Sequence, residues 1–551
     1  MRTAGSRQTA GFYHLQSSDR TKAHTISLRR LFFNCLLPAA CCLLLLLSSC
    51  SPRSNSFVLA LESSPKTLDP LKGFDASSER MRQLMFNTLM RKNEQLDYVP
   101  ELATPQVSAD GLTVTFTLQD NVKFHNGNPL TAADCKYTFE QLIYKHSADY
   151  PKAASFYEGA VKDNQPYITS IDAPDARTLV FHLRHPWLEL YANLIPIPII
   201  PEGTFDQQAQ HPIGTGPFKF VSWNESQQVV DMEANNDYWQ GAPNIKQLRV
   251  RVILDANTQQ AELRSGRVDL AINTALSPDA YVELAKDPNL QVTQSPGTNV
   301  QWLGFNTQSA PLTDARVRQA IAYAIDRESI VKNLLQGQAR VAHSMVPPES
   351  WAYAQGQVYN YDPAHAKQLL DEAGLRDPDG DGPAMRLSKD KALSFKISAS
   401  NVVVRQYAQV MQNQLQEVGL PVNIETLEDN TLREAQVNGQ FQLTAGRWVG
   451  GNQDPIFLRD LFTHLKGGNF NRSRYDNPEL DKILSEAVST ADRTRAKQLY
   501  QQAQELISRE MPALPLWYAN NIVIARKTVG NIQVPPGGDW TFVRSLTVAQ
   551  K

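Results

Sequence analysis

The sequence predicts a mixed α/β protein made of separate lobes, because strand patterns and helix patterns follow one another along most of its 551 residues. Short apolar or alternating segments between Pro- and Gly-rich turns are typical of strands, and apolar residues three and four apart are typical of helices. This mixed order favours α/β lobes over a β-sandwich. No period of 20–50 residues is visible in the sequence, which argues against a solenoid or a propeller.

Strand patterns are clearest in the first half of the chain. Residues 57–61 form a short apolar run, and residues 112–118 alternate strictly between apolar and polar side chains. Residues 179–183 resemble them, and all three are expected to be strands. Thr131 to Asp134 have the capping-box pattern that opens a helix, so Cys135 is expected to be a small buried residue of that helix.

Helical spacing dominates the second half of the chain. One predicted helix presents a single apolar face made of Val317, Ala320, Ile321, Ala324 and Ile325. Asp326 stands where the N-cap of a second helix is expected, and the apolar positions of that helix are Ile330, Val331 and Leu334. The same spacing predicts further helices at 363–373, 403–418, 478–489 and 492–509.

The N-terminal part has the pattern of an export signal. A 17-residue apolar stretch, Leu31–Leu47, follows Arg29 and Arg30, and the run Leu47-Ser48-Ser49-Cys50 ends it. This run resembles the bacterial lipobox, in which the cysteine becomes the lipidated first residue of the mature protein. We therefore expect residues 1–49 to be a cleaved signal, Cys50 to be lipidated and residues 50–56 to be a tether. An uncleaved transmembrane anchor is the alternative, although the stretch is short for a span.

Composition limits the partners that the exported part could bind. The whole chain has a formal net charge of −2. Residues 1–49 hold six basic residues and one acidic residue, so the remainder carries 48 basic and 55 acidic side chains and a net charge of −7. A mildly acidic protein offers no basic surface to nucleic acid, and none is expected as a partner.

No metal site and no cofactor are expected. The eight histidines after residue 49 form no H-E-x-x-H motif and no Cys/His cluster. Only Cys135 would remain besides Cys50, so no intrachain disulfide is expected. Residues Asp377–Asp381 begin like a calcium loop, but Ser388 stands at the twelfth position, where a glutamate is needed. An Asp/Gly turn is therefore preferred, and bound calcium is the alternative.

Catalytic motifs are also missing from the sequence. It contains no G-x-S-x-G elbow and no G-x-x-x-x-G-K-[ST] loop. An anchored hydrolase with a site assembled only in the fold stays open, and so does a signalling receptor or an exported chaperone. We expect a protein that is not an enzyme.

Blocks along nearly all of residues 57–530 are similar to those of the family 5 extracellular solute-binding proteins, the peptide, opine and nickel group of ABC importers. The most specific block is Arg316–Arg327. The others occur in the family's order and are Leu68–Pro70, Val122–Ala132, Gly214–Phe218, Asn236–Trp239, Glu372–Gly374, Trp448–Pro455 and Met511–Leu516.

The resemblance implies a two-lobed periplasmic-binding-protein fold of type II, in its large variant, with an extra α/β domain inserted in the first lobe. The first lobe would combine residues 57–100, 215–303 and 516–551. The inserted domain would be residues 101–214, and the second lobe residues 304–515. The chain would cross between the lobes near Leu303–Asn306 and Pro515–Tyr518, which would act as hinges.

The resemblance also implies a function. The protein would be the receptor of an ABC importer that closes around a small solute and presents it to a membrane permease served by a separate ATPase. A peptide-like solute, the family's commonest ligand, is the first expectation. A non-peptide solute, such as an opine, an oligosaccharide or a metal chelate, is the alternative. Acyl chains on Cys50 would hold the receptor, a monomer, at a membrane on the periplasmic or extracytoplasmic side.

The residue expected to bind a ligand ammonium group departs from the family pattern. Peptide-binding relatives carry an acid three residues after the tryptophan that corresponds to Trp448, and Gly451 occupies that position here. Arg447 stands directly before the tryptophan, and Asn452 follows the glycine. We therefore expect this pocket to favour a neutral or anionic group.

The same blocks place other residues at the ligand. Phe74, Asp75 and Ala76 would line the first-lobe side, and Asn273 lies on a loop that would meet the ligand backbone. Trp517 and Tyr518 lie at the second crossing, where relatives place an aromatic residue against the ligand. Core packing for the aromatic residues and a turn role for Asn273 are the alternatives.

Overall fold

The computed structural model describes residues 56–549 except 74, 146–149, 158–164, 188, 275, 377–385, 388–390, 449–454, 464–469 and 491. Cys50, Phe74, Gly451, Asn452 and the Asp377–Asp381 loop therefore lie outside the described residues, and the predictions made for them stay predictions. Residues 55–551 form one compact unit.

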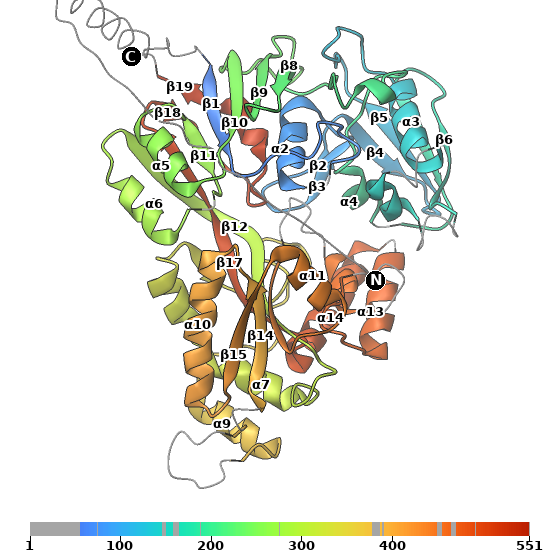
Figure 1. The fold of residues 1–551 in the computed structure, drawn as a ribbon. Helices are drawn as coiled ribbons and strands as arrows, with labels where there is room; N and C mark the ends of the chain where they lie inside the picture. The colour runs from blue at the N-terminus through green and yellow to red at the C-terminus, as the bar shows by residue number, and fades with distance from the viewer. Residues whose placement is uncertain are drawn as a thin grey trace, which may run out of the picture. The chain divides into compact units, whose positions relative to one another are not determined.

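A large mixed sheet runs through this unit (Figure 1). Its strands follow the order β15-β14-β16-β12-β17-β11-β1-β10-β9-β8, and β13 pairs with β17. Their bounds are β1 Phe57–Leu61, β8 Phe218–Asn224, β9 Val229–Ala234, β10 Gln247–Val252, β11 Leu270–Ile272, β12 Leu290–Phe305, β13 Ala339–Val341, β14 Leu393–Ser398, β15 Val422–Leu427, β16 Leu443–Trp448 and β17 Ala513–Arg526.

Two long antiparallel strands, β12 and β17, join the two halves of this sheet. The first part of β12 pairs with the last part of β17, next to β11, and the last part of β12 pairs with the first part of β17, next to β16. The register shifts between Ser295 and Asn299, opposite the stretch Ala519–Asn521. A second register shift lies between Gln301 and Trp302, and such irregularities locally interrupt the ladder and bend the strand.

The hydrophobic core is divided in the same way. One cluster joins β1 and α2 (Ala76–Met85) to the inserted sheet, and a second packs on the other face of β1. All five residues of β1 are buried because Phe57, Leu59 and Leu61 face the first cluster while Val58 and Ala60 face the second. Two further clusters pack against β14 and β16 and among the last helices.

The inserted domain is built on a four-stranded antiparallel sheet of order β4-β5-β7-β6. Its strands are β4 Ala103–Val107, β5 Thr113–Leu118, β6 Ile168–Asp172 and β7 Thr178–Leu183, and the short pair β2 Met90–Lys92 and β3 Tyr98–Pro100 precedes them. The predicted capping box opens α3 (Ala132–Glu140), and Cys135 is fully buried there. Burial raises the pKa of its thiol, so the predicted core role agrees with the structure.

The remaining helices lie mainly in the second half of the chain. The first helices are α4 Leu190–Leu194, α5 Ala256–Arg264 and α6 Pro278–Ala285, followed by α7 Ala315–Ala324, α8 Arg327–Ser329, α9 Pro363–Glu372, α10 Val402–Glu417, α11 Asp429–Val437, α12 Phe457–Phe462, α13 Pro478–Ser489 and α14 Arg493–Glu510. Asp326 is the predicted N-cap: its carboxylate accepts the backbone N–H of Ser329 at 2.8 Å. The helix it opens continues as a π-helix through Leu334.

Candidate functional site

Arg447, predicted to contact a ligand, is exposed to water and yet strongly influenced by the surrounding protein. It is the second-last residue of β16, and its side chain is exposed to water. Nevertheless, the surrounding protein desolvates the guanidinium and lowers its pKa, while the carboxylate of Glu62 attracts the charge. The side chain is therefore exposed to water but partly surrounded by protein atoms, and we call this position the Arg447 recess. Within the described part of the chain, the Arg447 guanidinium makes no ion pair or hydrogen bond.

The opposite wall of this recess belongs to the first lobe. Glu62 directly follows β1, and one of its carboxylate oxygens pairs with the guanidinium of Arg80 on α2. The guanidinium of Arg80 lies 5.5 Å above the ring of Trp540. The other oxygen of Glu62 is buried and has no hydrogen-bond partner among the described residues. The carboxylate therefore keeps one acceptor that a bound group can use.

The sequence did not single out Glu62 or Arg80. One signal pointed to Glu62: it stands at the carboxyl end of a buried strand that pairs in parallel with β10 and β11. Ligands of α/β proteins gather at the carboxyl ends of such strands. No local pattern marks Arg80, because its role depends on Glu62 and Trp540, which are distant in the sequence.

Trp448 belongs to an aromatic group beside the recess. Its half-buried ring stacks on Phe457 with 5.3 Å between centroids and an interplanar angle of 23°, and Phe470 meets it edge-on at 6.1 Å. Phe470 is itself 44% exposed. This arrangement leaves an aromatic edge accessible to solvent, and the role of Trp448 as a wall of the ligand pocket stays a prediction.

Trp517 and Tyr518 are buried in the second lobe. Trp517 is 4% exposed and meets Tyr407 edge-on at 5.0 Å. The hydroxyl of Tyr518 lies 2.6 Å from the carbonyl oxygen of Ser344 and 2.8 Å from that of Val346. These contacts are those of core aromatic residues, and contact of either ring with a ligand stays a prediction.

The two first-lobe candidates in the described part have clear local roles. The Asp75 carboxylate caps α2, accepting the backbone N–H of Ser78 at 2.9 Å and its hydroxyl at 2.7 Å. Ala76 is exposed at the first turn of this helix. The Asp75 carboxylate therefore binds its own helix, while the small side chain of Ala76 is open to solvent next to it.

Asn273 is tied to the strand that changes lobes. Its backbone has φ +49°, and its side-chain oxygen accepts the backbone N–H of Ile522 at 2.9 Å. Its side-chain nitrogen donates to the Asn521 side chain at 2.8 Å. Asn273 therefore fastens β11 to β17 beside the register shift, and its predicted contact with a ligand backbone stays a prediction.

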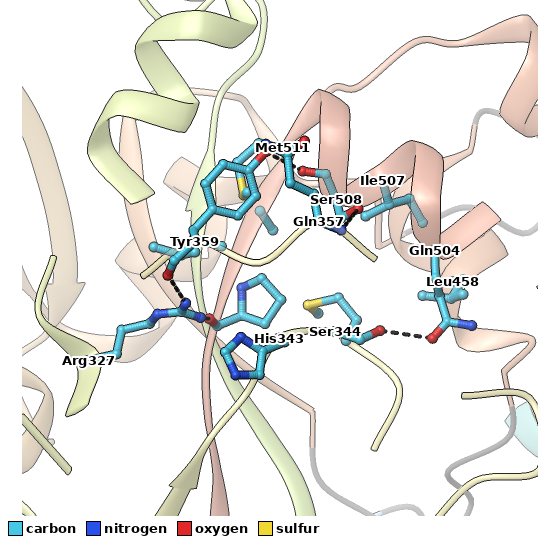
Figure 2. A pocket seen from close by; sticks show the side chains of 14 residues that line it. Arg327, His343, Ser344, Gln357, Tyr359, Leu458, Gln504, Ile507, Ser508 and Met511 are labelled. Atoms are coloured by element: carbon cyan, nitrogen blue, oxygen red, sulfur yellow. Dashed lines mark hydrogen bonds between the residues drawn. The ribbon is translucent and has the colours of Figure 1, made fainter. Parts of the chain in front are cut away.

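A hollow lies beside the start of β17, where its lining includes Ser344, which accepts the Tyr518 hydroxyl (Figure 2). Arg327, Tyr359 and His343 line it together with residues of α14, and burial lowers the pKa of His343. The guanidinium of Arg327 donates to the Tyr359 carbonyl, and the Ser344 hydroxyl donates to Gln504 at 2.8 Å. These bonds fasten the second lobe together, so the hollow is part of its scaffold.

The described residues hold no cluster of three or more His, Cys, Asp or Glu side chains that could bind a metal ion. In the same part of the chain, no helix is long and apolar enough to cross a membrane.

The geometry agrees with what comparisons with known proteins show. The profile of "Bacterial extracellular solute-binding proteins, family 5 Middle" matches residues 97–470. Heme-binding protein A of Haemophilus influenzae is 30% identical over 517 residues, which are 89% of this chain and 92% of that protein. Oligopeptide-binding protein AppA of Bacillus subtilis is 28% identical over 508 residues, which are 88% of this chain and 90% of that protein.

Solved structures confirm the two-lobed fold. The AppA structure in complex with a nonapeptide has a TM-score of 0.70 and 26% sequence identity, and the match covers 90% of this chain and 99% of that one. The ABC transporter substrate-binding protein CtaP of Listeria monocytogenes has the same fold, with a TM-score of 0.79, 22% identity and the same coverage of both chains. The chain therefore belongs to the bacterial extracellular solute-binding proteins of family 5.

Proposed function

We propose that this chain is the receptor of an ABC importer, that it captures a peptide-like solute between its two lobes, and that it delivers the solute to a permease. Relatives named for oligopeptides, D,D-dipeptides and glutathione support a peptide-like ligand. The similarity to a protein named for heme makes a non-peptide solute the second candidate. In either case the protein makes and breaks no bond in its ligand, so consumption of a bound solute would contradict the proposal.

The observation that carries the proposal is the Arg447 recess. A desolvated guanidinium is costly unless an anion compensates it, and the nearest carboxylate, Glu62, is already paired with Arg80. The three side chains together carry one uncompensated positive charge. A ligand carboxylate would compensate that charge, whereas a ligand ammonium group would be repelled by it. The ligand group at this wall is therefore anionic.

This assignment predicts a preference between two matched probes. We expect acetyl-tetra-alanine with a free carboxylate to bind roughly ten- to a hundredfold more tightly than the same peptide with a terminal amide, because a charge-assisted hydrogen bond contributes about 1.5–3 kcal/mol. Arg447→Gln should reduce this ratio to near one. Isothermal titration calorimetry measures both affinities.

Arg264→Gln is the matched control, because Arg264 is an exposed arginine at the end of α5 in the first lobe. It should leave the preference unchanged. If neither peptide binds, the peptide-like ligand is wrong. If both bind and Arg447→Gln keeps the preference, the ligand class is supported but the role of Arg447 is wrong.

We also propose that Cys50 carries acyl chains that hold the receptor at a membrane, after removal of residues 1–49. Mass spectrometry of the protein purified from its own host tests both proposals in one experiment. Under denaturing conditions, the intact mass should correspond to a chain that begins at Cys50 plus acyl groups. Under native conditions, the additional mass identifies the solute that co-purifies. A chain that retains residues 1–49 would contradict the anchor, and a non-peptide solute would favour the second candidate.

A further inference from the structure

A buried ion pair joins the inserted domain to the second lobe. Glu189 precedes α4, is 7% exposed, and lies next to Leu190 of the first-lobe core cluster. Arg459 lies on α12, whose apolar residues belong to a core cluster of the second lobe. The Nη1 atom of Arg459 is 4.0 Å from Oε1 of Glu189. Because the two residues belong to separate cores, a movement of the lobes would separate them.

The pair is incompletely satisfied. Its distance exceeds that of a hydrogen bond, and neither Oε1 of Glu189 nor Nε of Arg459 has a hydrogen-bond partner among the described residues. A second acid, Asp460, stands 3.8 Å from Nε of Arg459. One arginine is thus shared between two carboxylates, and if both are ionised the group carries an excess negative charge in a desolvated place.

The neighbours of this group are aromatic rather than charged. On the inserted-domain side, Trp187 lies close to Glu189 and stacks on Tyr167 with 4.6 Å between ring centroids. On the second-lobe side, Tyr500 of α14 faces Arg459, and so does Tyr167 across the contact. The charged groups that act on Glu189 are Arg459 and Asp460, and Arg459 acts on Asp460.

We propose that Glu189, Arg459 and Asp460 form a proton-linked latch, which makes closure of the lobes more favourable as the medium becomes acidic. The proposal rests on the lobe movement of the proposed function. It goes beyond that function because it makes capture of the solute dependent on external pH.

The direction of the pH effect follows from the pKa of Glu189 in the closed and in the open arrangement of the lobes. In the closed arrangement, burial raises its pKa to about 7 from 4.5, an effect that Asp460 strengthens and Arg459 opposes. Once the lobes part, the carboxylate meets water and its pKa returns toward the ordinary value. Closure therefore takes up a proton at pH values between these two. Ionised Glu189 disfavours closure above pH 7, and this cost disappears as the pH falls toward 5.

Asp460 adds to the effect at lower pH. Burial raises its pKa to about 6 from 3.8, and Arg459 opposes the change. It lies on the same helix as Arg459 and is 27% exposed, so it is less dependent on closure than Glu189. We therefore assign the main effect to Glu189.

A second ion pair across the lobes supplies a matched control. Asp97, next to β3, pairs with Arg493 at the start of α14, and both side chains are exposed, at 39% and 46%. Asp97→Asn removes a carboxylate from the same pair of lobes, but from a place where water already solvates it. Its effect on closure should be small and the same at pH 5.5 and 8.

The test measures affinity and proton uptake with acetyl-tetra-alanine, whose single carboxylate does not titrate between pH 5.5 and 8. We expect binding to be at least roughly tenfold tighter at pH 5.5 than at pH 8, because each unit by which closure raises the pKa of Glu189 corresponds to a factor of ten in affinity between the two pKa values. Calorimetry at pH 6 in buffers of different ionisation enthalpy should show protons taken up on binding. In Glu189→Gln, which mimics the protonated acid, binding at pH 8 should be as tight as at pH 5.5, without this uptake.

Small-angle X-ray scattering of the ligand-free protein provides a readout that does not need a peptide. Glu189→Gln should have a smaller radius of gyration than the wild type at pH 8, and the two should agree at pH 5.5. If the peptide does not bind, the proposed ligand class fails and the scattering comparison still decides the latch. The latch would be wrong if the radius of gyration and the affinity of the wild type did not change with pH. It would also be wrong if Glu189→Gln kept the pH dependence of the wild type.

Discussion

Gly297→Ala is expected to destabilise the protein by about 1–3 kcal/mol, because a side chain at this position has no space and the chain must move to make it. Gly297 lies in β12 at the register shift. A Cβ atom built on it would lie 2.1 Å from the carbonyl oxygen of Ala519 on β17. The obstacle is backbone rather than a flexible side chain, so the two strands that join the lobes would have to separate.

Gly304→Ala on the same strand is the matched control. Its Cβ atom would meet Cγ2 of Thr444 at 3.2 Å, the end of a side chain that can move slightly. Unfolding in urea, followed by circular dichroism, should give a clearly lower midpoint for Gly297→Ala and a midpoint near that of the wild type for Gly304→Ala. If both variants unfold at the same urea concentration, Gly297 is not a point of close approach in the folded protein.

The strand crossing also shows where prediction from the sequence reached its limit. Local patterns predicted β1, the capping box at Thr131 and the helices of the second half, since periodicity and capping depend on residues close in sequence. The crossings were predicted near Leu303–Asn306 and Pro515–Tyr518. Register shifts occur at Ser295–Asn299, opposite Ala519–Asn521, and at Gln301–Trp302, opposite Pro515–Trp517, and the place where the chain changes lobes stays a prediction. A bulge depends on how two distant strands pair, which no local pattern reveals.

The residues of the candidate site also differ in whether the sequence could predict them. Arg447 and Trp448 were predicted from one block of sequence; the structure places Glu62 near the Arg447 charge and stacks Trp448 on Phe457, and their contact with a ligand stays a prediction. Glu62 was missed because its importance depends on Arg80 and on the opposite lobe. The sequence could not decide whether Trp517 lines a pocket or packs in a core, because an aromatic side chain fits either place, and the structure gives it core contacts.

The second large effect is expected at Arg327, the last residue of the Arg316–Arg327 block. Its side chain is buried, with 4% of the residue exposed. Its guanidinium donates to the backbone carbonyls of Ala342 at 2.5 Å and Pro515 at 2.7 Å and to that of Tyr359 (Figure 2). Burial lowers its pKa to about 10, so the group stays charged at neutral pH.

Arg327→Met keeps most of the length of the side chain and removes all of its donors. Three buried carbonyls would then lose their partner, and we expect a loss of about 3–5 kcal/mol, the range found when one member of a buried polar network is removed. The three carbonyls belong to the segment after β13, to β17 and to the loop before α9. The loss should therefore appear as a lower urea midpoint of the whole second lobe.

Arg316→Met is the control for Arg327→Met, because it removes a different arginine from the same block. Arg316 is exposed and pairs with Asp314 at 2.6 Å, and because water screens such a pair, its removal should change stability little. Equal destabilisation by the two substitutions would show that the carbonyl network around Arg327 contributes nothing special. A much larger loss of unfolding free energy in Arg327→Met would indicate the role of this block, the most specific one in the sequence. The block would then stabilise the scaffold that positions β17 rather than contact the solute.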